Sequence, residues 1–417
     1  MTGSRGPASG PVTSGSMPGG AIVASRRWPL VILAGVAAGV HIWKVPPFVA
    51  EISERFGTSL VDAGFLMGVL QLAGVVGGLA VGFFAEYLGF RRCMLAGLAV
   101  LSVASIGGAF AAEFWMLLVL RGVESVGFLL AIVAGPGVIR SIAPPAQRSL
   151  ASGAWGSYMG LAAFGTLTVT ALLAGLATKE GTWIVAGALT AVVAVAVLLW
   201  VPADRPRSTR SDVSIRDSLS RTVRARGVWV CGLVFMFYAA TWMAVLGFLP
   251  TILGDAGADP GLANLLSGIA SGANVLGNVS AAVLLQRGAS ARLLLSIGAA
   301  VMAVSSFCIF ALELPTGGQF AAVLVFSAVA GLIPGTLFPL VLGVMPTGGS
   351  STTAVGILMQ CTNAGLFFGP PVLAALTTAT GNWSSSWWFT VALAAMALLL
   401  AQFLGVKRYG YRLGGAN

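Results

Sequence analysis

The sequence predicts an all-α membrane protein with twelve transmembrane helices arranged in two six-helix bundles. The first observation is composition, because 57% of the 417 residues are hydrophobic and only 9% are charged, outside the usual range of soluble domains. The second is that apolar runs of about 20 residues, long enough to cross a bilayer as helices, recur along the chain. The third is that Lys and Arg residues gather in every second loop between these runs.

The apolar runs follow one another from residue 28 to residue 404. They cover residues 28–50, 61–84, 93–111, 114–139, 149–175, 182–201, 228–253, 262–286, 293–312, 319–343, 352–377 and 384–404. Each run exceeds the roughly 10 residues of a transmembrane β-strand and lacks its alternating pattern, so the runs predict helices.

The basic residues indicate how the helices are oriented. Of the 23 Lys and Arg residues, Lys44 and Arg121 lie inside apolar runs, and only Arg55 and Lys179 lie in the loops of one side. The remainder lie in the tails and in the loops of the other side, which the positive-inside rule identifies as the cytoplasm. We therefore expect a multi-pass protein of the cell membrane with both termini cytoplasmic. The basic residues that give the net charge of +10 then lie next to the cytoplasmic leaflet of the lipid bilayer, and nucleic-acid binding is not expected.

Polar stretches divide the chain. Residues 1–27 are rich in Gly, Ser and Pro, which is typical of a disordered cytoplasmic tail. Residues 202–227 form the longest polar stretch between helices and predict a cytoplasmic linker. This linker separates an N-terminal bundle, 28–201, from a C-terminal bundle, 228–404, and residues 405–417 form a second cytoplasmic tail.

The two sets of six runs resemble each other at an offset close to 200 residues. Gly68 then aligns with Gly268, and Gly77 with Gly277. A duplicated bundle is typical of transporters in which two repeats rock about a site between them.

Four ionisable residues lie inside the membrane: His41 and Lys44 in the first run, Arg121 and Glu124 in the fourth. A charge at that depth costs roughly 2.5 to 3.5 kcal/mol, so such residues mark a functional site. Within each pair the spacing of three places both side chains on one helix face, and the rise of 1.5 Å per residue places both pairs at a similar depth. Three alternatives stay open: Arg121 and Glu124 pair only with each other, Lys44 reaches the outer surface, or His41 is merely hydrogen-bonded.

Two motifs resemble the major facilitator superfamily. Between the second and third runs, the segment from Gly82 to Arg92 is similar to that family's Gly-x-Leu-Ala-Asp-(Arg/Lys)-x-Gly-(Arg/Lys)-(Arg/Lys) signature, with Glu86 in place of Asp. In the fourth run, the segment from Arg121 to Gly127 resembles its Arg-x-x-Gln-Gly-x-Gly pattern. The Gly-Pro signature of drug–proton antiporters is missing from the fifth run. The Lys44-Val-Pro-Pro sequence faintly resembles the cyanate-permease-like branch.

The resemblance implies that the first, fourth, seventh and tenth helices line a central cavity, which would be net positive in this chain. Nine side chains are then candidates to bind substrate: Lys44, Arg121, Trp43, Tyr158, Tyr238, Trp242, Asn274, Gln360 and Asn363. Glu124 and His41 are candidates to exchange a proton. A conformational latch is expected at the signature loop, formed by Gly82, Glu86, Gly89, Arg91 and Arg92.

The predicted function is secondary active transport by alternating access, in which uptake of a small organic or inorganic anion is coupled to protons. The alternatives are export of an amphiphilic small molecule, for which the aromatic residues would serve, and a non-transporting sensor with a transporter fold. No lysine lies in a P-loop, and His41 is the single histidine, so no enzyme activity, metal site or cofactor is expected. The family resemblance implies that one chain functions as a monomer.

Overall fold

The fold is that of a helical membrane protein, described from a computed structural model. The structure describes residues 27–204 and 215–404, so the two predicted tails, apart from Arg27, lie outside the described residues. Some side chains within helices are also outside the description: those of residues 79, 81–84, 86, 146, 149, 215, 216 and 316.

The first six spans are built from nine α-helices, some of which are joined by short 3-10 turns. They comprise α2 (Trp28–Trp43), α3 (Val49–Phe56), α4 (Leu60–Gly68), α5 (Leu72–Leu88), α6 (Phe90–Ala109), α7 (Phe114–Ile142), α8 (Arg148–Gly156) with α9 (Tyr158–Leu172), and α10 (Lys179–Trp200). The first span is α2 with α3 as its extension, and the second is α4 with α5.

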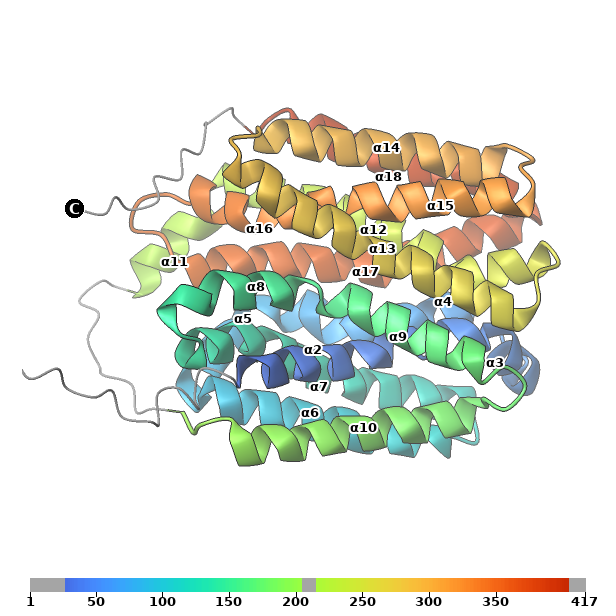
Figure 1. Ribbon diagram of the computed structural model, residues 1–417, viewed down its shortest axis with the longest axis horizontal. Helices are drawn as coiled ribbons and strands as arrows, with labels where there is room; N and C mark the ends of the chain where they lie inside the picture. Colours follow the sequence, from blue (N-terminus) through green and yellow to red (C-terminus); the bar gives the residue numbers. More distant parts are fainter. Residues whose placement is uncertain (1–26, 205–214, 405–417) are drawn as a thin grey trace, which may run out of the picture.

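The last six spans follow the same order. They comprise α12 (Arg226–Asp255), α13 (Pro260–Gln286), α14 (Ala291–Ala311), α15 (Thr316–Ala330) with α16 (Leu332–Val344), α17 (Ser351–Thr380) and α18 (Trp387–Ala401). We refer to α2–α10 as the N-terminal half and to α12–α18 as the C-terminal half. In Figure 1 the N-terminal half fills the lower part of the molecule and the C-terminal half the upper part.

The twelve predicted spans are all present as helices. Eleven segments among the described residues are long and apolar enough to cross a membrane, and the remaining span is divided at Ser157 into α8 and α9. One helix forms where the sequence predicts only a linker, namely α11 (Ile215–Val223). It lies at the end of the molecule where the C-terminal half begins (Figure 1).

Proline residues produce the break in the first span. Pro46 and Pro47 lack the N–H groups that the carbonyls of Ile42 and Trp43 would need, so α2 ends at Trp43 and a 3-10 turn (Pro46–Phe48) leads into α3. A matching break in the second span is the 3-10 turn Val69–Gln71. These two breaks leave carbonyl groups at the helix ends, inside the membrane, that can accept hydrogen bonds from other residues.

The two halves touch mainly where α13 packs against α9 and where α17 packs against α4 and α5. Small residues allow the close approach. A Cβ at Gly68 of α4 would overlap the carbonyl oxygen of Phe367 in α17, and a Cβ at Gly160 of α9 would lie 2.7 Å from Val275 in α13. The α12 helix adds a third contact, with the 3-10 turn at Pro46–Phe48.

Candidate functional site

The four ionisable residues of the first and fourth spans come together around the Glu124 carboxylate. Lys44 Nζ donates to Glu124 Oε1 at 2.5 Å, and Arg121 Nη1 donates to Glu124 Oε2 at 2.7 Å. His41 Nδ1 lies 3.3 Å from Glu124 Oε1. All four side chains are at most 1% exposed. We call His41, Lys44, Arg121 and Glu124 the charge cluster.

Lys44 points into the N-terminal half, toward helices of its own half. Its ammonium donates to Ser105 Oγ of α6 at 2.7 Å and lies 3.3 Å from His41 Nδ1. It also lies 4.7 Å from the centre of the Trp183 ring of α10, a cation–π contact. Lys44 therefore does not reach the outer surface, which was one of the alternatives that the sequence left open.

His41 connects the charge cluster to α10. Its Nε2 lies 2.9 Å from Thr190 Oγ1, and the Thr190 hydroxyl donates to the carbonyl of Ala186 at 2.8 Å. Since a hydroxyl has one hydrogen, Nε2–H is the donor to Thr190, which leaves Nδ1 as an acceptor facing Lys44.

Arg121 joins the two broken spans to α7. Its Nη1 donates to the carbonyl of His41 at 2.6 Å, and its Nε donates to the carbonyl of Leu66 at 3.3 Å. Both carbonyls belong to the last four residues of their helices, which lack partners within the helix. Ser125 of the same helix accepts from the backbone N–H of Ala73 at 2.8 Å, at the start of α5. Arg121 thus does more than neutralise Glu124, because it also satisfies the polar groups freed by both breaks.

Exchange of Arg121 for lysine is expected to lower the free energy of unfolding by about 2 to 4 kcal/mol. An ammonium keeps the charge but lacks the planar fork that serves two carbonyls and a carboxylate together. Thermal unfolding of the detergent-purified protein checks this, with Arg92→Lys as the control because the Arg92 side chain is exposed. An unchanged unfolding midpoint for Arg121→Lys would show that charge alone matters at this position.

The predicted aromatic residues form a second group where the two halves meet. Trp43 of α2 and Trp242 of α12 are in edge-to-face contact, with ring centroids 5.4 Å apart, and Trp242 stacks on Tyr238. Asn274 Nδ2 donates to the Tyr238 hydroxyl at 3.1 Å and to the carbonyl of Ser327 at 3.0 Å. We call Trp43, Tyr238, Trp242 and Asn274 the aromatic layer.

Several buried N–H donors have no hydrogen-bond acceptor among the described residues, and two of them, Trp43 Nε1 and Arg121 Nη2, belong to the groups defined above. Trp43 belongs to the aromatic layer and Arg121 to the charge cluster. Buried N–H groups are normally satisfied, so these two are the donors best suited to an additional acceptor such as an anion.

The remaining predicted binding residues take part in packing between helices. Gln360 of α17 donates to the carbonyl of Val75 at 2.7 Å, across the contact between the halves. Asn363 lies against Gly74, where a Cβ would overlap its amide. Tyr158 packs on Trp155 with ring centroids 5.2 Å apart and lies against Gly35 of α2. The structure therefore does not bring these three residues into the aromatic layer.

The predicted latch lies at the junction of α5 and α6. Gly89 there has a φ of +99°, which favours glycine, and a Cβ would also overlap the Asp204 carboxylate. That carboxylate accepts from the backbone N–H groups of Arg91 at 3.0 Å and Arg92 at 3.2 Å. Asp204 thus caps α6, a role that the sequence did not indicate. Gly82 and the Glu86 side chain lie outside the described side chains, so their part in a latch stays a prediction.

Several partners of the site were missed by sequence reasoning. Ser105 and Thr190 contact the charge cluster, Trp183 covers Lys44, and Ser327 accepts from Trp242 Nε1 at 3.2 Å. Serine and threonine are common in transmembrane helices, where their hydroxyls often bond within the helix. The available signal was the depth of Ser105 and Thr190 in their spans, which places both close to the level of Lys44.

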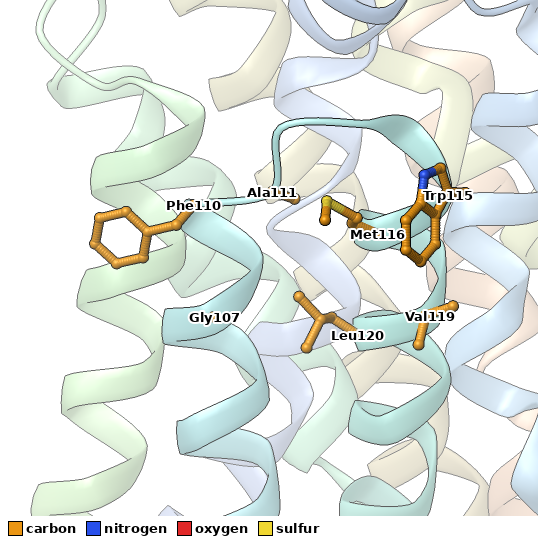
Figure 2. A pocket seen from close by; sticks show the side chains of 7 residues that line it. All are labelled: Gly107, Phe110, Ala111, Trp115, Met116, Val119 and Leu120. Carbon is orange, nitrogen blue, oxygen red and sulfur yellow. The ribbon is translucent and has the colours of Figure 1, made fainter.

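A hollow near the end of α6 is separate from these groups. It is lined by Gly107, Phe110, Ala111, Trp115, Met116, Val119 and Leu120 (Figure 2). Phe110 and Trp115 are exposed, so the hollow opens on the outer face of the helices and holds none of the predicted site residues. Within residues 27–204 and 215–404, no three His, Cys, Asp or Glu side chains are grouped as metal ligands.

Comparison with known proteins places this architecture in a family. The model of the Major Facilitator Superfamily matches residues 28–352. Over 122 residues the chain is 30% identical to the uncharacterized MFS-type transporter YwoD of Bacillus subtilis (strain 168), which is 28% of this chain and 27% of that relative. The chain therefore aligns with only about a quarter of that relative's length.

Solved structures show the same fold. A bacterial homolog of the human lysosomal transporter Spinster, in an inward-facing and occupied conformation, has a TM-score of 0.74 at 14% identity. The inward-facing and unoccupied conformation has a TM-score of 0.75 at 15% identity. Both comparisons cover 94% of this chain and 97% of the other chain. With the family model matched over most of its length and this fold throughout, the chain belongs to the Major Facilitator Superfamily.

Proposed function

We propose that this protein is a secondary active transporter of the cell membrane that couples uptake of a small organic or inorganic anion to protons. The termini would be cytoplasmic, and a single chain would alternate access by rocking its two halves. The observation that carries the proposal is the charge balance of the cluster. Lys44 and Arg121 face one carboxylate, Glu124, with His41 beside them, so the buried group holds one positive charge in excess.

An excess buried charge favours a compensating anion. The Coulomb energy of two unit charges 8 Å apart is about 2 kcal/mol at an effective dielectric constant near 20, so the anion need not touch Lys44. The aromatic layer lies next to the charge cluster along α2, because Trp43 and Lys44 are consecutive. The unpaired donors Trp43 Nε1 and Arg121 Nη2 support an anion held between the two groups.

The proton supplies the coupling in this proposal. Glu124, His41 and Lys44 are the members of the cluster that can change their charge, whereas an arginine stays cationic. Adding one proton raises the positive charge of the cluster, which attracts the anion. The proton and the anion therefore strengthen each other's binding.

Reconstitution into proteoliposomes tests the function. A panel of labelled anions, namely lactate, pyruvate, succinate, nitrate and phosphate, is first screened by thermal shift at two pH values, and the stabilising anions are then assayed for counterflow and for uptake driven by external acid. We expect at least one anion to stabilise more at the lower pH and to accumulate with the gradient. Lys44→Ala and Arg121→Ala are expected to abolish uptake, while Lys179→Met, a buried lysine outside the cluster, retains it. Wild-type rates in both alanine variants would contradict the proposal.

Export of an amphiphilic molecule is the second candidate, and the aromatic layer favours it. Trp43, Trp242 and Tyr238 present large apolar surfaces from both halves at their contact. This candidate predicts stabilisation by amphiphilic compounds that is independent of pH and insensitive to Lys44→Ala.

A further inference from the structure

We infer that Lys44 is the group that takes up and releases the coupling proton, an inference that rests on the transport function proposed above. Three members of the charge cluster can change their charge, namely Glu124, His41 and Lys44. Each is judged by the hydrogen bonds that it would keep, and by the net charge that would remain, after gaining or losing one proton.

Glu124 is badly placed to accept a proton. Its Oε1 receives a hydrogen bond from Lys44 at 2.5 Å and its Oε2 receives one from Arg121 at 2.7 Å. A proton on Oε2 would point toward the Arg121 N–H, and a proton on Oε1 could be donated to His41 Nδ1 at 3.3 Å only by displacing Lys44 from the oxygen that is its closest acceptor. Protonation would also leave two buried cations with no counter-charge among the described residues, which is the most unfavourable charge state of the cluster.

His41 is also badly placed to accept a proton. Its Nε2–H is used by Thr190, so a second proton would go to Nδ1, which lies 3.3 Å from Lys44 Nζ and 3.3 Å from Glu124 Oε1. That step would set an imidazolium against an ammonium and remove the acceptor of one Lys44 N–H. It would also raise the excess charge of the buried cluster from one to two.

Lys44 can lose a proton with little disturbance. The step converts its –NH₃⁺ to –NH₂ and delivers one H⁺ to water, and it leaves Arg121 and Glu124 as a neutral pair. The two remaining N–H groups still serve Glu124 Oε1 and Ser105 Oγ, the closest partners. The N–H given up is the one directed to His41, the longest of the three contacts at 3.3 Å. His41 can then donate from Nδ1, because the Thr190 hydroxyl can turn to donate to Nε2.

Among the residues that the structure describes, no other group near Lys44 would take over this role. Ionisable neighbours are His41 on α2 itself and Arg121 and Glu124 on α7. The α6 helix contributes Ser105, and α10 contributes the Trp183 ring and Thr190, none of which is ionisable near neutral pH. Lys179, one turn from Trp183, is paired with Glu180 at 3.4 Å.

Transport assays with matched substitutions test the inference. Lys44→Arg keeps a permanent positive charge, whereas Lys44→Met keeps the length without charge. For the anion selected from the panel, Lys44→Arg is expected to retain counterflow at equal pH but to lose acid-driven accumulation at least tenfold. Lys44→Met is expected to bind the anion more weakly, on the order of tenfold, because the cluster is then neutral. Accumulation by Lys44→Arg at the wild-type level would overturn the inference while leaving the proposed function intact.

A second measurement needs no substrate. The chain contains three lysines, Lys44, Lys179 and Lys407, so protein labelled with ¹³C at lysine Cε gives a spectrum simple enough to assign. The signal lost in Lys44→Arg belongs to Lys44. We expect its chemical shift to change between about pH 5 and pH 9, a range in which an unperturbed lysine stays protonated. A Lys44 signal that is constant over this range would overturn the inference. Failure of the proposed function alone would appear differently, as a titrating Lys44 in a protein that transports none of the anions.

Discussion

Replacing Glu124 with glutamine is expected to lower the free energy of unfolding by about 3 to 5 kcal/mol, because it removes one partner of a buried ion pair. Glu124 is the carboxylate shared by Lys44 and Arg121, and all three side chains are at most 1% exposed. Glutamine has nearly the same shape, so the loss reports on charge and not on packing. Thermal and denaturant unfolding of the purified protein measure it.

Two further substitutions make this prediction specific. Lys44→Met leaves Arg121 and Glu124 as a balanced pair, so its destabilisation is expected to be clearly smaller than that of Glu124→Gln. Glu113→Gln, at the start of the same helix, is the control because Glu113 is exposed and its change is expected to stay within about 0.5 kcal/mol. Equal losses for Glu124→Gln and Lys44→Met would contradict the assignment of Lys44 as the surplus cation of the cluster.

A valine at Gly68 is expected to push apart α4 and α17, and with them the two halves of the molecule. The carbonyl oxygen of Phe367 occupies the place of a Cβ at Gly68, and backbone atoms cannot turn aside as a side chain can. Overpacking of this kind costs about 1 to 3 kcal/mol. That energy acts only on conformations in which the two helices touch here, so it shifts the population toward conformations in which they are apart, by roughly tenfold to a hundredfold.

Spin labels at Glu54 and Ala256 measure this shift, since both residues are exposed and lie on different halves at the same end of the molecule. The labels require replacement of Cys93, Cys231, Cys308 and Cys361, which are free cysteines. We expect longer distances in Gly68→Val. Gly165→Val is the matched control, because no atom lies within 4 Å of a Cβ at that position. An unchanged distance distribution in Gly68→Val would mean that the contact yields locally and does not hold the halves together.

The spans were predictable from the sequence because their length and composition are set by the bilayer itself. The break at Ser157 and the helix α11 were not, since the first leaves the apolar run uninterrupted and the second lies in a polar stretch. The grouping of His41, Lys44, Arg121 and Glu124 followed from helical spacing and depth, which a single sequence contains. The sequence did not predict which helices surround the charge cluster, because this depends on how α2 is rotated against α6 and α10.

The same limit applies to the polar residues of the C-terminal half. Asn274 and Gln360 were both expected at a binding site. Asn274 bonds to Tyr238 and Ser327 within the aromatic layer, whereas Gln360 bonds to the carbonyl of Val75 across the contact between the halves. Amides in transmembrane helices serve either purpose, and only the contacts between helices distinguish them. Asp204 was overlooked for a related reason, since its partners are backbone N–H groups 112 and 113 residues away.

Trp43 is the last residue of α2 and Lys44 caps that helix, but their side chains contact opposite neighbours. The indole lies against Trp242 of the C-terminal half, while the ammonium lies among α6, α7 and α10. Successive residues of a helix are turned by about 100°, so no rotation of this helix end moves one side chain without the other. In the proposed alternating access, movement of the C-terminal half against the Trp43 indole would therefore also turn the backbone that carries the buried ammonium.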